Sequence, residues 1–113
     1  MKIGIASQNL KTITAHAGKT RKFIVYDSSP DGSWAEDYTI KLPKEMSMHE
    51  FTGTEHPLDE LDVLIVGGCG PGFIRKMQRR GVEVIATSET SPVNAIKTYV
   101  AGQPLPAAAP HEH

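Results

Sequence analysis

Residues 62–72 read Asp-Val-Leu-Ile-Val-Gly-Gly-Cys-Gly-Pro-Gly. The unbroken apolar run Val63–Val66 is typical of a strand that is buried on both faces of a sheet. A helical pattern follows from Pro71, because the missing N–H of proline costs little in a first helical turn. A glycine-rich turn that carries Cys69, the one cysteine of the chain, therefore joins a central strand to a helix. Open α/β sheets place their ligand crevices at such turns.

The glycine-rich turn fits none of three established motifs. A nucleotide phosphate loop needs Lys-Ser/Thr where Phe73-Ile74 stands. A dinucleotide fingerprint needs a third glycine in place of Phe73, and a thioredoxin-type motif needs a second cysteine. A tight turn in which the glycines permit positive φ angles would explain the glycines. It would leave unexplained a thiol at a place where helix N–H groups favour anions.

The composition is that of one domain of 113 residues, with 39% hydrophobic residues, 22% charged residues and a net charge of −1. This balance argues against a nucleic-acid partner. A single cysteine excludes an intrachain disulfide and suits a reducing compartment. No apolar run approaches the roughly 18 residues that span a bilayer, and the N-terminus lacks the layout of a signal peptide. We therefore expect a soluble cytoplasmic protein without a membrane partner.

Alternation of apolar and polar residues predicts four further strands around the central one. Their ranges are Lys2–Ser7, Arg21–Asp27, Trp34–Leu42 and Val82–Thr87. The small residues Gly4 and Ala6 indicate that one face of the first strand is closely covered. Residues 28–32, Ser-Ser-Pro-Asp-Gly, form a strong turn signal, so the second and third strands should pair as a hairpin.

Three helices are expected between and after these strands. They lie at Glu45–Phe51, from Pro71 to the capping Gly81, and from the N-cap Ser91 to Gly102, with one further helical turn at Pro57–Leu61. The last helix should bury Val93, Ile96 and Val100.

The element order β-β-β-α-β-α-β-α predicts an α/β fold with a mixed five-stranded sheet flanked by helices. This domain covers residues 1–102. Residues 103–113 are rich in proline and alanine, end in His-Glu-His and are predicted to form a flexible tail.

Four segments, in their order and spacing, resemble the dinitrogenase iron–molybdenum cofactor biosynthesis family, which includes the nitrogen-fixation X- and Y-type proteins and the C-terminal part of the B-type proteins. The segments are Met1–Ala6, His16–Asp27, Asp62–Gly72 and Arg80–Val84. The resemblance spans residues 1–102 and implies a ribonuclease-H-like fold. It also implies that the protein carries an iron–sulfur or iron–molybdenum cluster precursor as cargo, with nitrogenase or cofactor-assembly proteins as partners.

A fold name does not bring nuclease activity with it. Nucleases of that fold hold two metal ions on carboxylates clustered along the central strands. The predicted first strand Lys2–Ser7 has no Asp or Glu, and Asp62 begins the central strand rather than ending it. We therefore expect a protein that is not an enzyme.

The resemblance and the glycine-rich turn together select the candidate cofactor-binding residues. They are Cys69, His16, Gly68, Gly70, Gly72 and Arg75, with Cys69 and His16 as the metal ligands. Thiolate and imidazole are both common iron ligands. The alternative is an unreactive thiol in a turn and a solvated loop histidine. His49 and His56 are weaker candidates whose spacing could fit a metal site with Cys69.

Several basic residues have two interpretations. Arg75, Lys76, Arg79 and Arg80 share a helix face that is either simply solvated or, at Arg75 or Lys76, attracts an anionic cluster. Lys19, Arg21 and Lys22 could add to that field. Two other functions also stay open: a regulatory or interaction domain without a cluster, and a thiol-dependent redox protein using Cys69. The second lacks a cysteine to resolve an oxidised thiol within one chain.

Overall fold

The computed structural model describes residues 1–108; residues 109–113, and with them the His-Glu-His end of the predicted tail, lie outside the described part. The five strands are β1 Lys2–Ala6, β2 Lys22–Ser28, β3 Trp34–Lys41, β4 Val63–Val66 and β5 Glu83–Ala86. The two α-helices are α1 Pro71–Arg79 and α2 Pro92–Val100. Short 3-10 turns are η1 Ala17–Lys19, η2 Lys44–Met46 and η3 Pro57–Glu60.

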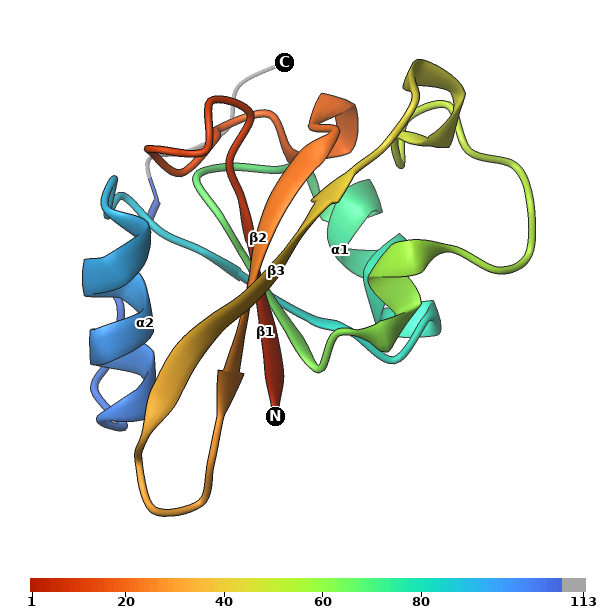
Figure 1. The fold of residues 1–113 in the computed structure, drawn as a ribbon. Coiled ribbons are helices and arrows are strands. Elements are labelled where there is room, and N and C mark those ends of the chain that lie inside the picture. Colours follow the sequence, from red (N-terminus) through yellow and green to blue (C-terminus); the bar gives the residue numbers. More distant parts are fainter. Residues whose placement is uncertain (109–113) are drawn as a thin grey trace.

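The strands form one mixed sheet in the order β3-β2-β1-β4-β5. Strand β2 is antiparallel to its neighbours β1 and β3, whereas β1, β4 and β5 run parallel. Helix α1 covers one face of this sheet and α2 the other (Figure 1). The predicted α/β fold, its hairpin and its five strands are confirmed. Because β1 and β4 are parallel, their carboxyl ends lie at the same end of the sheet, and the segments that follow them leave the sheet there.

Two apolar clusters hold the three layers together. On the α1 side, Phe23 and Leu64 pack with Met77 of the helix. On the α2 side, Ile5 and Ile65 pack with Ile96, which is fully buried. Successive residues of a strand point to opposite faces, so the continuous apolar runs of β2 and β4 supply both clusters.

The close cover predicted over β1 is present at Gly4, where an added Cβ would lie 2.5 Å from the Leu61 side chain. Both helices end as the sequence predicts. Gly81 and Gly102 have φ angles of +78° and +75°. The N–H of Val82 donates to the Met77 carbonyl, a hydrogen bond typical of a Schellman end.

Two predictions about helices are wrong in detail. The expected helix over Glu45–Phe51 is divided into η2 and a separate turn in which the Phe51 N–H donates to the Ser47 carbonyl, because Ser47 takes an extended conformation with ψ 150°. In α2, Val93 is 41% exposed, whereas Pro92, Ala95 and Ile96 are buried. Of the residues predicted to be buried, Ile96 is in the core and Val100 packs against the α2-side cluster, so the prediction is wrong for Val93, and Pro92 and Ala95 are buried instead.

The segment after α2 returns to the sheet rather than leaving the domain. Ala107 forms an antiparallel bridge with Thr87, and the Thr87 hydroxyl donates to the Pro106 carbonyl at 2.6 Å. Leu105 packs against the α2-side cluster. These contacts differ from the flexibility predicted to start at Gln103. Within residues 1–108, no helix is long and apolar enough to cross a membrane.

Candidate functional site

The turn between β4 and α1 is built on a close backbone approach at Gly67. The Gly67 N–H donates to the Thr14 carbonyl at 2.8 Å. A Cβ at Gly67 would lie 2.9 Å from that oxygen and 3.2 Å from the Ala15 Cα, so a side chain has no room. Positive φ angles among the described glycines occur at Gly32, Gly81 and Gly102. The interpretation of this turn as glycines that permit positive φ is therefore wrong; Gly67 is needed for packing.

The loop after β1 is fastened to the same turn. The Thr14 N–H donates to the Ala6 carbonyl at 2.7 Å, and the Ala17 N–H donates to the Gly68 carbonyl at 3.3 Å. Ala17 is buried and begins η1 directly after His16. The Thr20 hydroxyl closes this small turn by donating to the His16 carbonyl at 2.9 Å. The loops that carry the candidate ligands His16 and Cys69 follow the parallel strands β1 and β4, and these bonds bring the two loops together as predicted.

A cavity of about 500 Å³ opens between these loops, within the range of roughly 300–1,000 Å³ that is usual for ligand sites. Its lining residues are His16, Ala17, Gly18, Lys19, His49, Cys69, Gly70 and Phe73. We call this cavity the Cys69 pocket. The Cys69 thiol thus shares one cavity with His16, the predicted imidazole ligand, and with His49, one of the two weaker candidates. His49 is placed there by its N–H, which donates to the Gly18 carbonyl at 2.7 Å.

The Cys69 thiol is half-buried, and burial raises its pKa above the ordinary value. The sequence suggested the opposite, that the start of α1 favours the thiolate. The helix start contributes little because Pro71 has no N–H and the Phe73 N–H is already bound to the Gly70 carbonyl at 3.1 Å. Desolvation therefore prevails, and the resting thiol is neutral at pH 7.

The remaining predicted site residues are distributed differently around the turn. Gly70 lines the Cys69 pocket, and Gly68 lies behind it, with its carbonyl bound to Ala17. Gly72 and Arg75 are exposed and are not among the lining residues. Their predicted contact with a bound group stays a prediction. The cation that does line the cavity is Lys19, from the opposite loop.

His56 has a structural part in the fold, away from the Cys69 pocket. It is 5% exposed, its Nδ1 accepts from the Leu58 N–H at 3.0 Å, and its Nε2 lies 2.6 Å from the Met46 carbonyl oxygen. An acceptor at Nδ1 and a donor at Nε2 define the neutral imidazole. Burial, the largest influence, lowers its pKa. His56 thus caps η3 and is not positioned to bind a metal beside Cys69.

Lys76 and Arg80 are not the simply solvated side chains that the helix pattern allows. The Lys76 ammonium donates to the Met48 carbonyl at 2.7 Å. The Arg80 guanidinium lies 2.8 Å from Asp59 and over the Phe51 ring, 5.3 Å from its centre. These contacts hold the connection between β3 and β4 against α1. They therefore position His49 at the Cys69 pocket.

The donor set around the Cys69 pocket does not suit a single ion. Within residues 1–108, no three His, Cys, Asp or Glu side chains lie close enough together to hold one metal ion. A structural zinc ion needs four converging ligands. A multinuclear cluster differs, because separate metal atoms of one cluster can each take a protein ligand.

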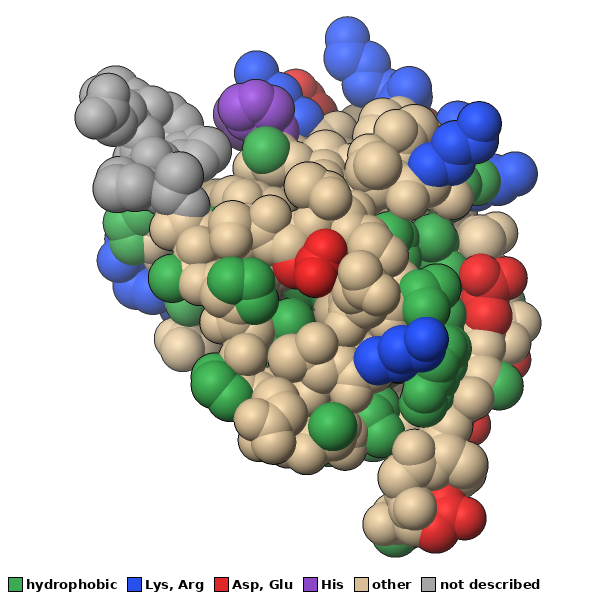
Figure 2. Space-filling model, turned by 90° about the vertical axis from the view of Figure 1, so that its left-hand side faces the viewer, with side chains coloured by type: hydrophobic (Ala, Val, Ile, Leu, Met, Phe, Trp, Pro, Cys, Tyr) green, Lys and Arg blue, Asp and Glu red, His purple; other side chains and the backbone are tan. Residues whose placement is uncertain are grey.

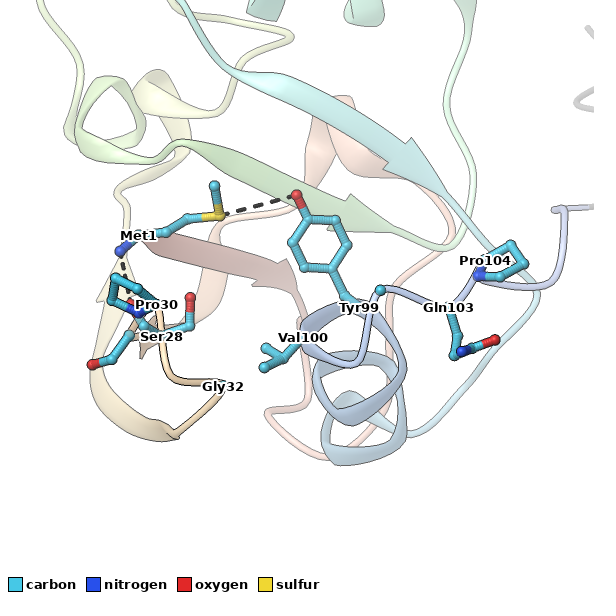
Figure 3. A pocket seen from close by; sticks show the side chains of 10 residues that line it. Met1, Ser28, Pro30, Gly32, Tyr99, Val100, Gln103 and Pro104 are labelled. Atoms are coloured by element: carbon cyan, nitrogen blue, oxygen red, sulfur yellow. Dashed lines mark hydrogen bonds between the residues drawn. The ribbon is translucent and has the colours of Figure 1, made fainter.

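A cavity larger than the Cys69 pocket lies elsewhere. It measures about 730 Å³ and separates the turn of the β2–β3 hairpin from the C-terminal end of α2 (Figure 3). Met1 and Tyr99 face one another across it, with the Tyr99 hydroxyl 4.0 Å from the methionine sulfur. Its lining includes no cysteine or histidine. The volume of a cavity therefore does not by itself identify the candidate functional site of this protein.

The fold and the Cys69 pocket define a small α/β protein with a thiol and two imidazoles at the carboxyl edge of a mixed sheet. Residues 1–102 match the family described as dinitrogenase iron–molybdenum cofactor. The chain belongs to this family, and the resemblance seen in the sequence is confirmed. A search among curated proteins found no match.

Solved structures share the fold at low sequence identity. PH0822 has a TM-score of 0.69 at 17% identity, covering 91% of this chain and 93% of its own. A proposed dinitrogenase, MJ0327 from Methanocaldococcus jannaschii, has a TM-score of 0.65 at 11% identity, covering 91% and 90%. A proposed NifB protein of the DUF35 family, TM1290 from Thermotoga, has a TM-score of 0.62 at 16% identity, covering 99% and 97%. The whole α/β architecture is therefore common to these proteins.

Proposed function

We propose that this protein is a non-catalytic carrier that binds an iron–sulfur or iron–molybdenum cluster precursor during nitrogenase cofactor assembly. The observation that carries this proposal is that Cys69, His16 and His49 all line one open cavity. Membership of the dinitrogenase iron–molybdenum cofactor family supports the identity of the cargo. The recipient would be nitrogenase or a cofactor-assembly protein in the cytoplasm, where a reducing environment keeps Cys69 as a thiol.

The chemistry of the Cys69 pocket suits a cargo that must leave again. The thiol would lose its proton to bind iron as thiolate, and His16 or His49 would add an imidazole ligand. Lys19 would offset the negative charge of a sulfide-rich cluster. So few protein ligands leave cluster positions open to a recipient. The sparse donor set therefore favours transfer over permanent storage.

A thiol-dependent redox function has less support. The raised pKa of Cys69 lowers the fraction of reactive thiolate at neutral pH. The chain also has no second cysteine to resolve an oxidised one. An interaction domain without a cluster is the other alternative, and the experiment below separates it from the carrier.

Anaerobic titration with purified iron–sulfur and iron–molybdenum clusters, followed by visible absorbance and bound iron, tests the proposal. Loss of a cluster ligand should weaken uptake in Cys69→Ala by at least about tenfold, and in His16→Ala by less, since remaining donors compensate in part. Lys97→Ala, an exposed change on α2, is the matched control and should bind as wild type does.

Equal uptake by wild type, Cys69→Ala and His16→Ala would remove both residues from the site. Failure of wild type to take up any cluster tried would favour the interaction domain.

A further inference from the structure

A group of basic side chains lies beside the Cys69 pocket. A second hollow of about 400 Å³ shares Lys19 and His49 with that pocket, and its lining also includes Arg21 and Lys44. In Figure 2 most Lys and Arg side chains in view gather at the upper end of the molecule, near a histidine. We define the cationic rim as Lys19, Arg21, Lys22, Lys41 and Lys44.

Two lysines of the cationic rim are placed where they lower the stability of the fold. Lys22 of β2 lies directly opposite Lys41 of β3 on the last rung of their antiparallel ladder. Like charges opposite one another destabilise a strand pair. Among residues 1–108 the ion pairs are those of the N-terminus with Asp27 and of Arg80 with Asp59, so no residue of the cationic rim forms an ion pair, although Glu50 lines the same hollow. This uncompensated charge points to a ligand rather than to the fold.

The cationic rim also wraps around both faces of the sheet. The neighbouring rung, Phe23 with Ile40, belongs to the α1-side cluster. Because side chains alternate along a strand, Lys22 and Lys41 project from the opposite face. Lys19 and Lys44 line the hollow beside the Cys69 pocket. A charged surface spread over two faces fits a broad partner better than one small anion.

Acidic residues occupy the other end of the sheet. Asp27 lies next to the last residue of β2, Glu36 and Asp37 lie in β3 near the hairpin turn, Asp62 directly precedes β4, and Glu83 begins β5. These carboxylates outnumber Lys2, the basic residue that lies beside Asp27 and Asp62, so the two ends of the sheet differ in charge. An electric dipole along the strands orients an approaching partner and speeds association.

We infer that the cationic rim docks an acidic protein surface, one with clustered Asp and Glu side chains, next to the Cys69 pocket. Its part in cluster transfer rests on the proposed function. Lys19 lines both cavities, so a protein seated on the cationic rim lies at the pocket. Nucleic acid fits less well, because the cationic rim has no aromatic residue for stacking, Glu45 and Glu50 flank it, and the chain has a pI near 6.5.

A labelled octaglutamate peptide serves as the probe, with octaglutamine and a single-stranded DNA oligonucleotide as comparisons. Fluorescence anisotropy is measured at an ionic strength of about 10 mM, where charges act over about 30 Å. The double variant Lys22→Glu/Lys41→Glu should bind octaglutamate about tenfold more weakly than wild type. The control Arg79→Glu/Lys97→Glu changes the net charge equally on exposed residues away from the cationic rim and should lose much less affinity.

The inference is overturned if both double variants lose affinity equally, if wild type does not prefer octaglutamate to octaglutamine, or if the oligonucleotide binds more tightly. It is also overturned if sedimentation shows that the cationic rim binds the acidic pole of a second copy instead. Cluster uptake measured on Lys22→Glu/Lys41→Glu should fall much less than in Cys69→Ala, since neither lysine lines the Cys69 pocket. Failed uptake by wild type with intact peptide binding would reject the carrier proposal alone.

Discussion

The two faces of the sheet are stabilised in different ways. On the α2 face the contacts are apolar, and the buried Ala95 and Ile96 pack directly on the strands. On the α1 face, polar contacts from Lys76, Arg80 and His56 also hold the connection between β3 and β4. That connection supplies His49 to the Cys69 pocket. The stability of the α1 face, which carries the candidate site, therefore depends in part on charges and hydrogen bonds and should respond to pH and salt. The stability of the α2 face depends on apolar packing and should respond less.

The largest effect is expected where the two ligand-bearing loops meet. Gly67→Ala should lower the free energy of unfolding by about 1–3 kcal/mol, because a Cβ has no room beside the backbone of Thr14. It should also weaken cluster uptake by separating His16 from Cys69. Chemical denaturation and cluster titration measure the two effects.

For the free energy of unfolding, Gly72→Ala is the matched control, since a Cβ there would meet nothing within 4 Å. Equal losses of stability in the two variants would show that the close approach at Gly67 is not what joins the loops.

A smaller effect separates the two faces directly. Arg80→Ala should destabilise the protein by about 1 kcal/mol, because the partly exposed pair with Asp59 and the contact with Phe51 are lost together. Amide hydrogen exchange should rise in residues 44–61 and stay unchanged in α2. Arg79→Ala, at an exposed position one residue earlier, should change the stability by less than about 0.5 kcal/mol. Faster exchange in α2 as well would contradict the division between the faces.

The smallest effect concerns pH. Burial lowers the pKa of His56 in the folded state below its ordinary value of 6.5, so the unfolded chain binds the proton more readily. The free energy of unfolding should therefore decrease as the pH falls below about 6.5, and this contribution should level off below the folded-state pKa. Denaturation at a series of pH values measures the slope.

His56→Asn provides the comparison, since asparagine can accept the Leu58 N–H as an N-cap but does not titrate in this range. The variant should show a flatter pH dependence. A slope identical to that of wild type would assign the effect to other groups.

The strands and the meeting of Cys69 with His16 were predictable because both depend on local pattern and on parallel strand order. The short apolar run Val63–Val66 and the glycines after it are sufficient for that inference. The position of His49 at the Cys69 pocket could not be predicted in this way. It depends on the hydrogen bond of Lys76 to Met48, 28 residues away, and on the ion pair of Arg80 with Asp59, 21 residues away. Such polar contacts leave no periodic signal in the sequence.

The structural reason for a glycine at position 67 could not be predicted from the sequence either. A glycine that avoids a backbone clash and one that permits a positive φ angle are the same letter in a sequence, and only the neighbouring Thr14 distinguishes them. Val93 was wrongly assigned to the buried face of α2 because it has helical spacing with Ile96, whereas the residues buried beside Ile96 are the smaller Pro92 and Ala95.

The return of the chain to Thr87 bears on aggregation. A mixed sheet has two outer strands, here β3 and β5, whose unpaired backbone groups could recruit a strand from another molecule. Ala107 occupies the end of the β5 edge through its bridge to Thr87. The register shift at Val25/Tyr26 and the charged Glu36, Asp37 and Lys41 guard the β3 edge. Both outer strands are thereby kept from pairing with another copy, so the protein does not polymerise through its own sheet.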